Sequence, residues 1–102
     1  MAIIKLTKDN FDEVTSSEKK VLVDFYADWC GPCRMLSPIV EEIANEHPEF
    51  VIAKVNVDDE GELAMRFDVS SIPTLVVLKN GETVNRAMGV RPKAAVLSLL
   101  ED

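Results

Sequence analysis

The chain has 102 residues, of which 47% are hydrophobic, and a net charge of −7 at pH 7. This length fits one domain over residues 1–102, and the apolar content excludes a disordered chain. The acidic balance argues against binding nucleic acid and against docking on an anionic membrane, because both need basic patches. The sequence contains no apolar run of about 18 residues, as a membrane span requires. Residues 1–5 are too short in apolar length for a signal peptide, so we expect a cytoplasmic protein.

The first half of the chain alternates between strand and helix patterns. Residues 3–6 predict a short strand, and residues 8–16 predict a helix. The nearly continuous apolar run of residues 21–27 predicts a strand that is buried on both faces. A helix over residues 31–47 follows, because apolar side chains recur there at helical spacing, and Pro38 should kink it.

The middle of the chain adds a second buried strand over residues 51–57. Asp58 and Asp59 are of a residue type that favours helix starts, so we expect a short helix to begin there. Leu63 and Phe67 give that helix one apolar face.

A hairpin and a helix complete the chain. Asn80-Gly81 separates strand patterns over residues 74–79 and 82–88, and Asn-Gly indicates a two-residue turn because both positions need positive φ. Pro92 marks the start of the last helix. The order βαβαβαββα predicts an α/β fold with a mixed central β-sheet and helices on both faces, because strand–helix–strand units give parallel strands.

The two cysteines of the chain, Cys30 and Cys33, follow a buried strand and open a helix. A helix N-terminus favours an anion, so Cys30 should be an exposed and activated thiolate, which is the nucleophilic form of cysteine. Cys33 lies one turn further along the same face, where it can attack a mixed disulfide held on Cys30. Gly31 and Pro32 shape the turn between them. This pattern predicts thiol–disulfide chemistry.

Two other interpretations of the cysteines are a zinc half-site and ordinary buried residues. Zinc needs four ligands, and the other candidate is His47, about four turns along the helix. The missing ligands and the distance of His47 argue against zinc, and the position at a helix start argues against ordinary buried cysteines. We therefore expect no metal.

Two charged residues interrupt the buried strands, namely Asp24 in the first and Lys54 in the second. Burying a charge is costly, so each side chain either faces solvent or has a function. The functional interpretation makes Asp24 a general base beneath the dithiol. Burial would raise the pKa of this carboxylate, which could then take the proton of Cys33, while Lys54 partly offsets its charge.

Other residues near the dithiol have two interpretations each. Trp29, the one tryptophan, is either a core aromatic or a partly exposed docking residue. Pro73 begins a strand, where proline is ordinary, and its bond with Ile72 is either trans or cis. Gly89 either makes a turn or lets a partner backbone come close. We interpret Arg34 as solvated surface.

The residues around the dithiol resemble those of a known family. Residues 23–33, which read VDFYADWCGPC, closely resemble the active-site signature of the thioredoxin family. Residues 71–74 resemble its cis-proline loop, and residues 79–81 resemble its hairpin turn. The resemblance covers nearly the whole chain and implies a thioredoxin fold. Arg34 is a departure, because lysine is frequent at this position.

The resemblance implies a role for each residue of the site. Cys30 would be the attacking cysteine and Cys33 the buried resolving cysteine, with Asp24 as the buried carboxylate and Lys54 as its neighbour. The Ile72–Pro73 bond would be cis and packed against the dithiol, and the Ile72 backbone would hydrogen-bond an extended substrate segment. An apolar docking surface would be formed by Trp29, Gly31, Pro32, Val57, Ile72, Pro73 and Gly89.

The resemblance also implies a function, which is that of a general protein disulfide reductase and electron carrier. Its partners would be disulfide-containing proteins and a thioredoxin reductase, commonly an NADPH-dependent flavoprotein. The protein itself would be a monomer without flavin or metal, and its redox group would be the Cys30–Cys33 disulfide.

Two alternatives to a reductase stay open. One is an oxidase or isomerase of the same fold, against which Gly31-Pro32 argues because oxidising relatives usually carry a histidine between the cysteines. The other is a subunit that only binds partners through its apolar surface. The intact cysteines argue against binding as the sole role.

Overall fold

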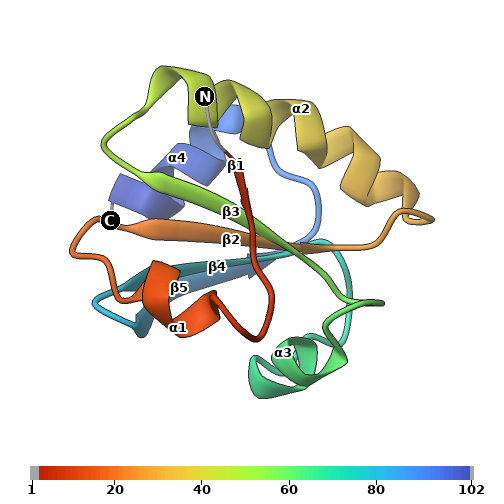
Figure 1. The fold of residues 1–102 in the computed structure, drawn as a ribbon. Helices are drawn as coiled ribbons and strands as arrows, with labels where there is room; N and C mark the ends of the chain where they lie inside the picture. Colours follow the sequence, from red (N-terminus) through yellow and green to blue (C-terminus); the bar gives the residue numbers. More distant parts are fainter. Residues whose placement is uncertain (1–2, 102) are drawn as a thin grey trace.

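Five strands of the computed structural model, which describes residues 3–101, form one sheet between two layers of helices (Figure 1). The strands are β1 (Ile3–Lys5), β2 (Val21–Tyr26), β3 (Val51–Asn56), β4 (Thr74–Lys79) and β5 (Glu82–Met88). The helices are α1 (Phe11–Thr15), α2 (Gly31–Glu46), α3 (Gly61–Arg66) and α4 (Lys93–Glu101). This is the predicted order of elements. Residues 1, 2 and 102 of the predicted domain lie outside the described range.

The strands are arranged in the order β1-β3-β2-β4-β5. β1, β3 and β2 are parallel, while β4 pairs antiparallel with both β2 and β5. The predicted mixed sheet with an antiparallel hairpin at one edge is therefore confirmed. β2 lies at the centre of the sheet, with β3 on one side and β4 on the other.

The predicted hairpin turn is also confirmed. Asn80 and Gly81 have φ values of 53° and 81°, which is the left-handed conformation that the turn needs. Their N–H groups donate to the carbonyls of Ser17 at 3.0 Å and Thr15 at 2.9 Å. The hairpin is therefore attached to the end of α1.

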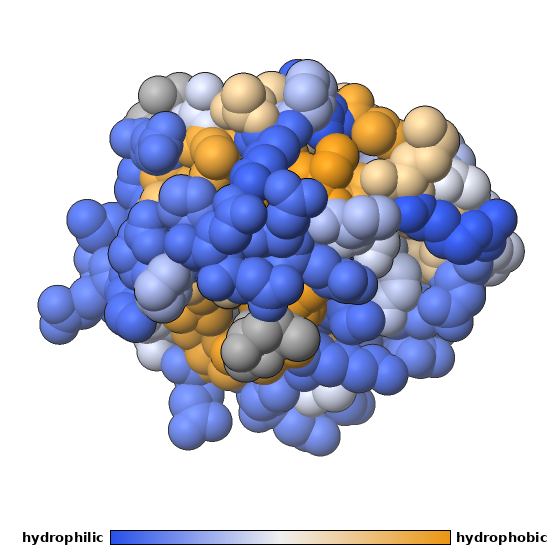
Figure 2. All heavy atoms as spheres, turned by 90° about the horizontal axis from the view of Figure 1, so that it is seen from above, coloured by the Kyte–Doolittle hydropathy of each residue, from blue (hydrophilic) through white to orange (hydrophobic). Residues whose placement is uncertain are grey.

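The helices bury both faces of the sheet, with α2 and α4 on one side and α1 and α3 on the other (Figure 1). Successive side chains of a strand point to opposite faces. Val23 of β2 belongs to the core that contains side chains of α1 and α3, whereas Leu22 packs with those of α2 and α4. Asp24, two residues after Leu22, therefore points toward α2. Hydrophilic side chains cover most of the outer surface in Figure 2.

α2 is held over the sheet by one buried apolar stripe, formed by Leu36, Val40 and Ile43. The helix continues through Pro38 without interruption. Lys93 of α4 donates to Glu42 and Glu46 of α2 at 2.8 and 2.5 Å. The helix that carries the cysteines is therefore fixed along its length.

Two predicted helix starts are wrong by about three residues. α1 begins at Phe11 and not at residue 8, because Asn10 Oδ1 accepts the Thr7 N–H at 2.8 Å and closes a turn before the helix. α3 begins at Gly61, after Asp58 and Asp59, and no side chain caps it. Asp58 has a different partner, described below.

The two edges of the sheet differ from its centre. Within the described residues, β1 contains 3 residues. Along β5 most side chains are exposed, and Arg86 donates to the carbonyls of Phe67 at 2.5 Å and Asp68 at 3.1 Å. One edge strand is thus short in the described range, and the other is largely exposed and bonded through Arg86 to a neighbouring loop.

The same substitution in β4 and β5 tests the assignment of the core. Val77 is 0% exposed and Val84 is 53% exposed. We expect Val77→Ala to lower the free energy of unfolding in urea by about 2–3 kcal/mol, from lost burial and the cavity left behind. Val84→Ala should change it by less than about 0.5 kcal/mol. Equal losses in the two variants would contradict the burial of β4 relative to β5.

Candidate active site

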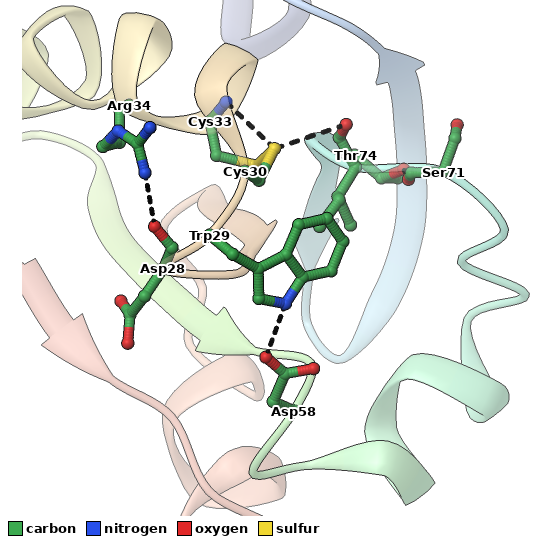
Figure 3. The surroundings of a disulfide bond; sticks show 9 residues. Asp28, Trp29, Cys30, Cys33, Arg34, Asp58, Ser71 and Thr74 are labelled. Carbon is green, nitrogen blue, oxygen red and sulfur yellow. Dashed lines mark hydrogen bonds between the residues drawn. A yellow bond between two sulfur atoms is a disulfide. The ribbon is translucent and has the colours of Figure 1, made fainter.

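The dithiol pair stands at the predicted helix start. Cys30 is the N-cap of α2, with extended backbone, and Pro32 lies in the first turn. A disulfide joins Cys30 to Cys33, with their Cα atoms 5.3 Å apart (Figure 3). The Cys33 N–H donates to Cys30 Sγ at 3.2 Å, so the sulfur receives one of the free N–H groups of the helix end. This contact is the structural basis for stabilising a thiolate on Cys30.

The two cysteines are equally buried, at 4% exposed each, so the expectation that Cys30 is exposed is wrong. Both pack with Ala27 in a small apolar cluster that Val57 and Ile72 cover. The loops that follow β3 and precede β4 therefore shield Cys30 as well as Cys33. The Ile72 carbonyl oxygen lies 3.8 Å from Cys30 Sγ.

Asp24 is buried beneath this cluster, at 5% exposed. The interpretation in which it faces solvent is therefore wrong. Its Oδ1 has no hydrogen-bond partner among the described residues. Burial raises the pKa of Asp24 from 3.8 to about 7, and the charge of Lys54 offsets part of this rise. The carboxyl can therefore both release and accept a proton near neutral pH.

Lys54 lies directly beside Asp24, since the two residues are partners in the parallel pairing of β2 and β3. They share the face of the sheet that α2 covers. Lys54 Nζ lies 5.3 Å from the centre of the Tyr26 ring, which is within cation–π distance. The predicted position of Lys54 on the strand adjacent to Asp24 is confirmed.

A cavity of about 210 Å³ connects Asp24 with the dithiol. It is lined by Asp24, Tyr26, Cys33, Arg34, Ser37 and Lys54, together with Ala27 and Asp28. The charged and hydroxyl groups of this lining give the cavity enough polar partners to hold water, which transfers protons between groups that do not touch. Asp24 and Cys33 thus border one shared cavity.

The loop before β4 forms the other wall of the site. The Ile72–Pro73 peptide bond is cis, as the resemblance implies, and Pro73 is buried. The Pro73 carbonyl accepts the Gly89 N–H at 2.8 Å, and Gly89 has a φ of 88°, which glycine adopts without strain. The space beside the Gly89 Cα is open. This glycine therefore both makes a turn and leaves room for a chain to approach.

Trp29 is 68% exposed, so its interpretation as a core aromatic is wrong. Its Nε1 donates to Asp58 Oδ2 at 2.9 Å (Figure 3). The sequence contains a signal for this pair, because Trp29 and Asp58 each follow one of two adjacent parallel strands, and such strand ends meet at one edge. Asp58 therefore holds the indole and does not begin α3.

Arg34 has a partner that no sequence pattern indicates. Its Nη1 donates to the Asp28 carbonyl at 2.7 Å, while its backbone N–H donates to the Cys30 carbonyl at 3.2 Å. The interpretation of Arg34 as solvated surface therefore misses a specific contact with the loop beside the dithiol.

The fold gathers the rest of the predicted docking surface around the same point. Gly31 and Pro32 lie between the cysteines, and Val57 packs on the cysteine cluster. Among residues 3–101, no group of three or more His, Cys, Asp or Glu side chains is arranged to hold a metal ion. His47 caps the far end of α2. No helix in this range is long and apolar enough to cross a membrane.

A disulfide at a helix N-terminus, above a buried carboxyl and beside a cis-proline loop, defines a protein-disulfide oxidoreductase. Residues 2–102 match the family model for thioredoxin. The chain is 50% identical over 103 residues to thioredoxin of Mycobacterium tuberculosis, covering 99% of this chain and 89% of that one. It therefore belongs to the thioredoxin family.

Two further relatives extend the comparison. The bifunctional thioredoxin reductase/thioredoxin of Mycobacterium leprae is 48% identical over 93 residues, covering 90% of this chain and 20% of that protein. The solved structure of a mutant thioredoxin from Halobacterium salinarum has a TM-score of 0.90 and 39% identity. That likeness covers 99% of this chain and 93% of the other, so it includes the whole architecture described above.

The buried carboxyl predicts a pH-dependent difference between the wild type and Asp24→Asn. The pKa of Asp24 is about 7 in the folded protein and near 3.8 in the unfolded chain, so folding favours its protonated form. The free energy of unfolding of the wild type should therefore fall as the pH rises from about 4 to about 7, by at most roughly 4 kcal/mol. Asp24→Asn has no carboxyl at this position, so its free energy of unfolding should not fall in this way. The difference in stability between the variant and the wild type should therefore shift in favour of the variant across the same pH range.

Urea unfolding at pH 4, 6 and 8 measures this difference. Asp9→Asn, at an exposed position, is the matched control for the change of side chain. A gain for Asp24→Asn that is equal at pH 4 and pH 8 would contradict a raised pKa at this position.

Proposed function

We propose that this protein is a general disulfide reductase for protein substrates and that a thioredoxin reductase restores its dithiol. The observation that carries the proposal is the Cys30–Cys33 disulfide at the start of α2, bordered by the Ile72–Pro73 loop. Support for the reductase as partner comes from the Mycobacterium leprae relative, whose name joins thioredoxin reductase and thioredoxin in one chain.

The proposed reaction consists of two exchanges. The Cys30 thiolate attacks one sulfur of a substrate disulfide, forms a mixed disulfide and releases the other substrate sulfur as a thiolate. The Cys33 thiolate then attacks Cys30 Sγ, which forms the Cys30–Cys33 disulfide and releases the second substrate thiolate. Two electrons pass to the substrate, and no cofactor within the chain takes part.

Asp24 and Lys54 are proposed to control the proton in the second exchange. Cys33 must lose its proton before it attacks, and Asp24 opens into the same cavity with a pKa of about 7. A base with a pKa near the working pH is the most effective proton acceptor. Lys54 limits the rise of that pKa and so keeps part of the carboxyl ionised.

Substrate docking is proposed to use the apolar surface around the disulfide. The open space beside Gly89 and the Ile72 carbonyl near Cys30 favour an extended segment that runs past the cis-proline loop. The acidic, single-domain chain would work as a monomer and carry electrons in the cytoplasm.

Insulin reduction tests the overall function. We expect the protein to accelerate insulin reduction by dithiothreitol, and to support it with NADPH and a thioredoxin reductase in place of dithiothreitol. The Cys30→Ser, Cys33→Ser double variant is the control. A wild-type rate equal to that of dithiothreitol alone would refute the function.

Single cysteine variants test the unequal roles of the two sulfurs. Cys33→Ser should accumulate a mixed disulfide between Cys30 and the substrate, because the resolving sulfur is missing. Cys30→Ser should accumulate none. Mass spectrometry under non-reducing conditions measures the adduct. An adduct on Cys33 as abundant as that on Cys30 would contradict the unequal roles of the two sulfurs.

The role of Asp24 is tested by the rate at which the mixed disulfide resolves. Asp24→Asn should slow this step by about tenfold to a hundredfold at pH 7, because general base catalysis contributes on that order or more. The slowing should shrink at high pH, where Cys33 ionises without help. Equal rates for wild type and variant at pH 7, measured by stopped-flow fluorescence of Trp29, would exclude Asp24 as the base.

A further inference from the structure

We propose that Arg34 is a positioning residue that holds Trp29 in place beside the dithiol for the docking of protein substrates. The inference rests on the proposed function, since it concerns how a substrate reaches Cys30. Arg34 lies on α2, outside the apolar docking surface, and would affect substrate docking through Trp29.

The contacts of Arg34 tie the loop before Cys30 to the first turn of α2. The guanidinium Nη1 donates to the Asp28 carbonyl at 2.7 Å, and the backbone N–H of Arg34 donates to the Cys30 carbonyl at 3.2 Å. Asp28 and Cys30 are the two neighbours of Trp29 in the chain. The bond to the Cys30 carbonyl is the first main-chain bond of α2, which any residue but proline would make at this position. The bond to the Asp28 carbonyl depends on the arginine side chain, and it holds the backbone on the N-terminal side of the tryptophan.

The side chain of Trp29 is fixed from a different direction. Its indole Nε1 donates to Asp58, which follows β3. Figure 3 shows that Asp28 is hydrogen-bonded to Arg34 of α2, whereas Trp29 is hydrogen-bonded to Asp58, which follows β3. Trp29 nevertheless stays 68% exposed. An exposed aromatic side chain with fixed backbone and fixed ring is suited to binding and not to core packing.

Fixing Trp29 before binding has a defined energetic effect. Ordering a mobile side chain or loop during association costs free energy, and a preorganised surface avoids that cost. Loss of the Arg34 bond would therefore weaken docking of a large substrate, which raises KM. A small disulfide that reaches the sulfurs without covering Trp29 does not use the preorganised indole, so its rate should fall less.

The type of residue matters at this position. A planar guanidinium presents donors in a fixed fork, whereas a lysine ammonium is a single point on a flexible stem. Lysine retains the charge and one donor, so it should restore part of the contact. Glutamine removes the charge and is too short to reproduce the geometry.

The test compares Arg34→Gln, Arg34→Lys and, as the control for charge, Lys79→Gln at the exposed end of β4. KM and kcat are measured with insulin in the NADPH-coupled assay. The rate with 5,5′-dithiobis(2-nitrobenzoic acid) reports the reactivity of the cysteines alone. Fluorescence anisotropy reports the mobility of Trp29 in the oxidised protein without any substrate, because Trp29 is the one tryptophan.

We expect Arg34→Gln to raise KM for insulin about threefold to tenfold. Arg34 also lines the cavity of Asp24 and Cys33, so the effect on docking is read as a ratio: kcat/KM for insulin should fall about threefold to tenfold more than the rate with the small disulfide. The anisotropy of Trp29 should fall. Arg34→Lys should lie between Arg34→Gln and wild type in both readouts, and Lys79→Gln should match wild type.

Two results would overturn the inference. Unchanged KM and unchanged anisotropy in Arg34→Gln would show that the contact does not hold Trp29. An equal loss with insulin and with the small disulfide would assign Arg34 to the reactivity of the cysteines. Failure of the wild type to reduce insulin would refute the proposed function, while the anisotropy would still decide whether Arg34 fixes Trp29.

Discussion

The burial of β2 between β3 and β4 is the constraint on which the site depends. With a neighbour on each edge and helices on both faces, this strand fixes the position of every residue that it carries. Its carboxyl end leads directly into Trp29 and Cys30. Because successive side chains of β2 point to opposite faces of the sheet, Asp24 lies on the face that α2 covers. The dithiol and the carboxyl below it are therefore held by one strand and the helix that follows it.

The proposed role of Asp24 opposes the stability of the fold. A well-packed strand would normally carry an apolar residue at position 24, and an ionised carboxyl there opposes folding. The fold tolerates it because the polar cavity and Lys54 lie beside the carboxyl, while Leu36 and Ile43 anchor α2 elsewhere. The raised pKa of Asp24 thus reflects a position in which the ionised carboxylate is unfavourable, as is common at functional sites.

Features of the site that depend on local sequence could be predicted, and those that depend on distant contacts could not. The buried run of β2, the hairpin turn at Asn80 and the cysteines at a helix start follow from periodicity and residue type. The burial of Cys30 depends on Val57 and Ile72, which arrive from other parts of the chain. The Trp29–Asp58 pair could have been found from the ends of two adjacent parallel strands, whereas no pattern marks the Asp28 carbonyl, six residues before Arg34, as the acceptor of its guanidinium. The cis conformation of the Ile72–Pro73 bond could be predicted from the family resemblance, but not from the local sequence pattern.

The edges of the sheet have a consequence for behaviour at high concentration. An unpaired strand edge is a template for association with other chains. Within the described residues β1 offers only the short template Ile3–Lys5, and β5 carries exposed charged side chains at Glu82 and Arg86, of which Arg86 is bonded to a neighbouring loop. The docking proposed above would pair substrate backbone with the loop beside the disulfide. Edges of this kind disfavour backbone pairing elsewhere on the sheet, so contacts with other chains would be concentrated at a place where thiol–disulfide exchange also releases the partner.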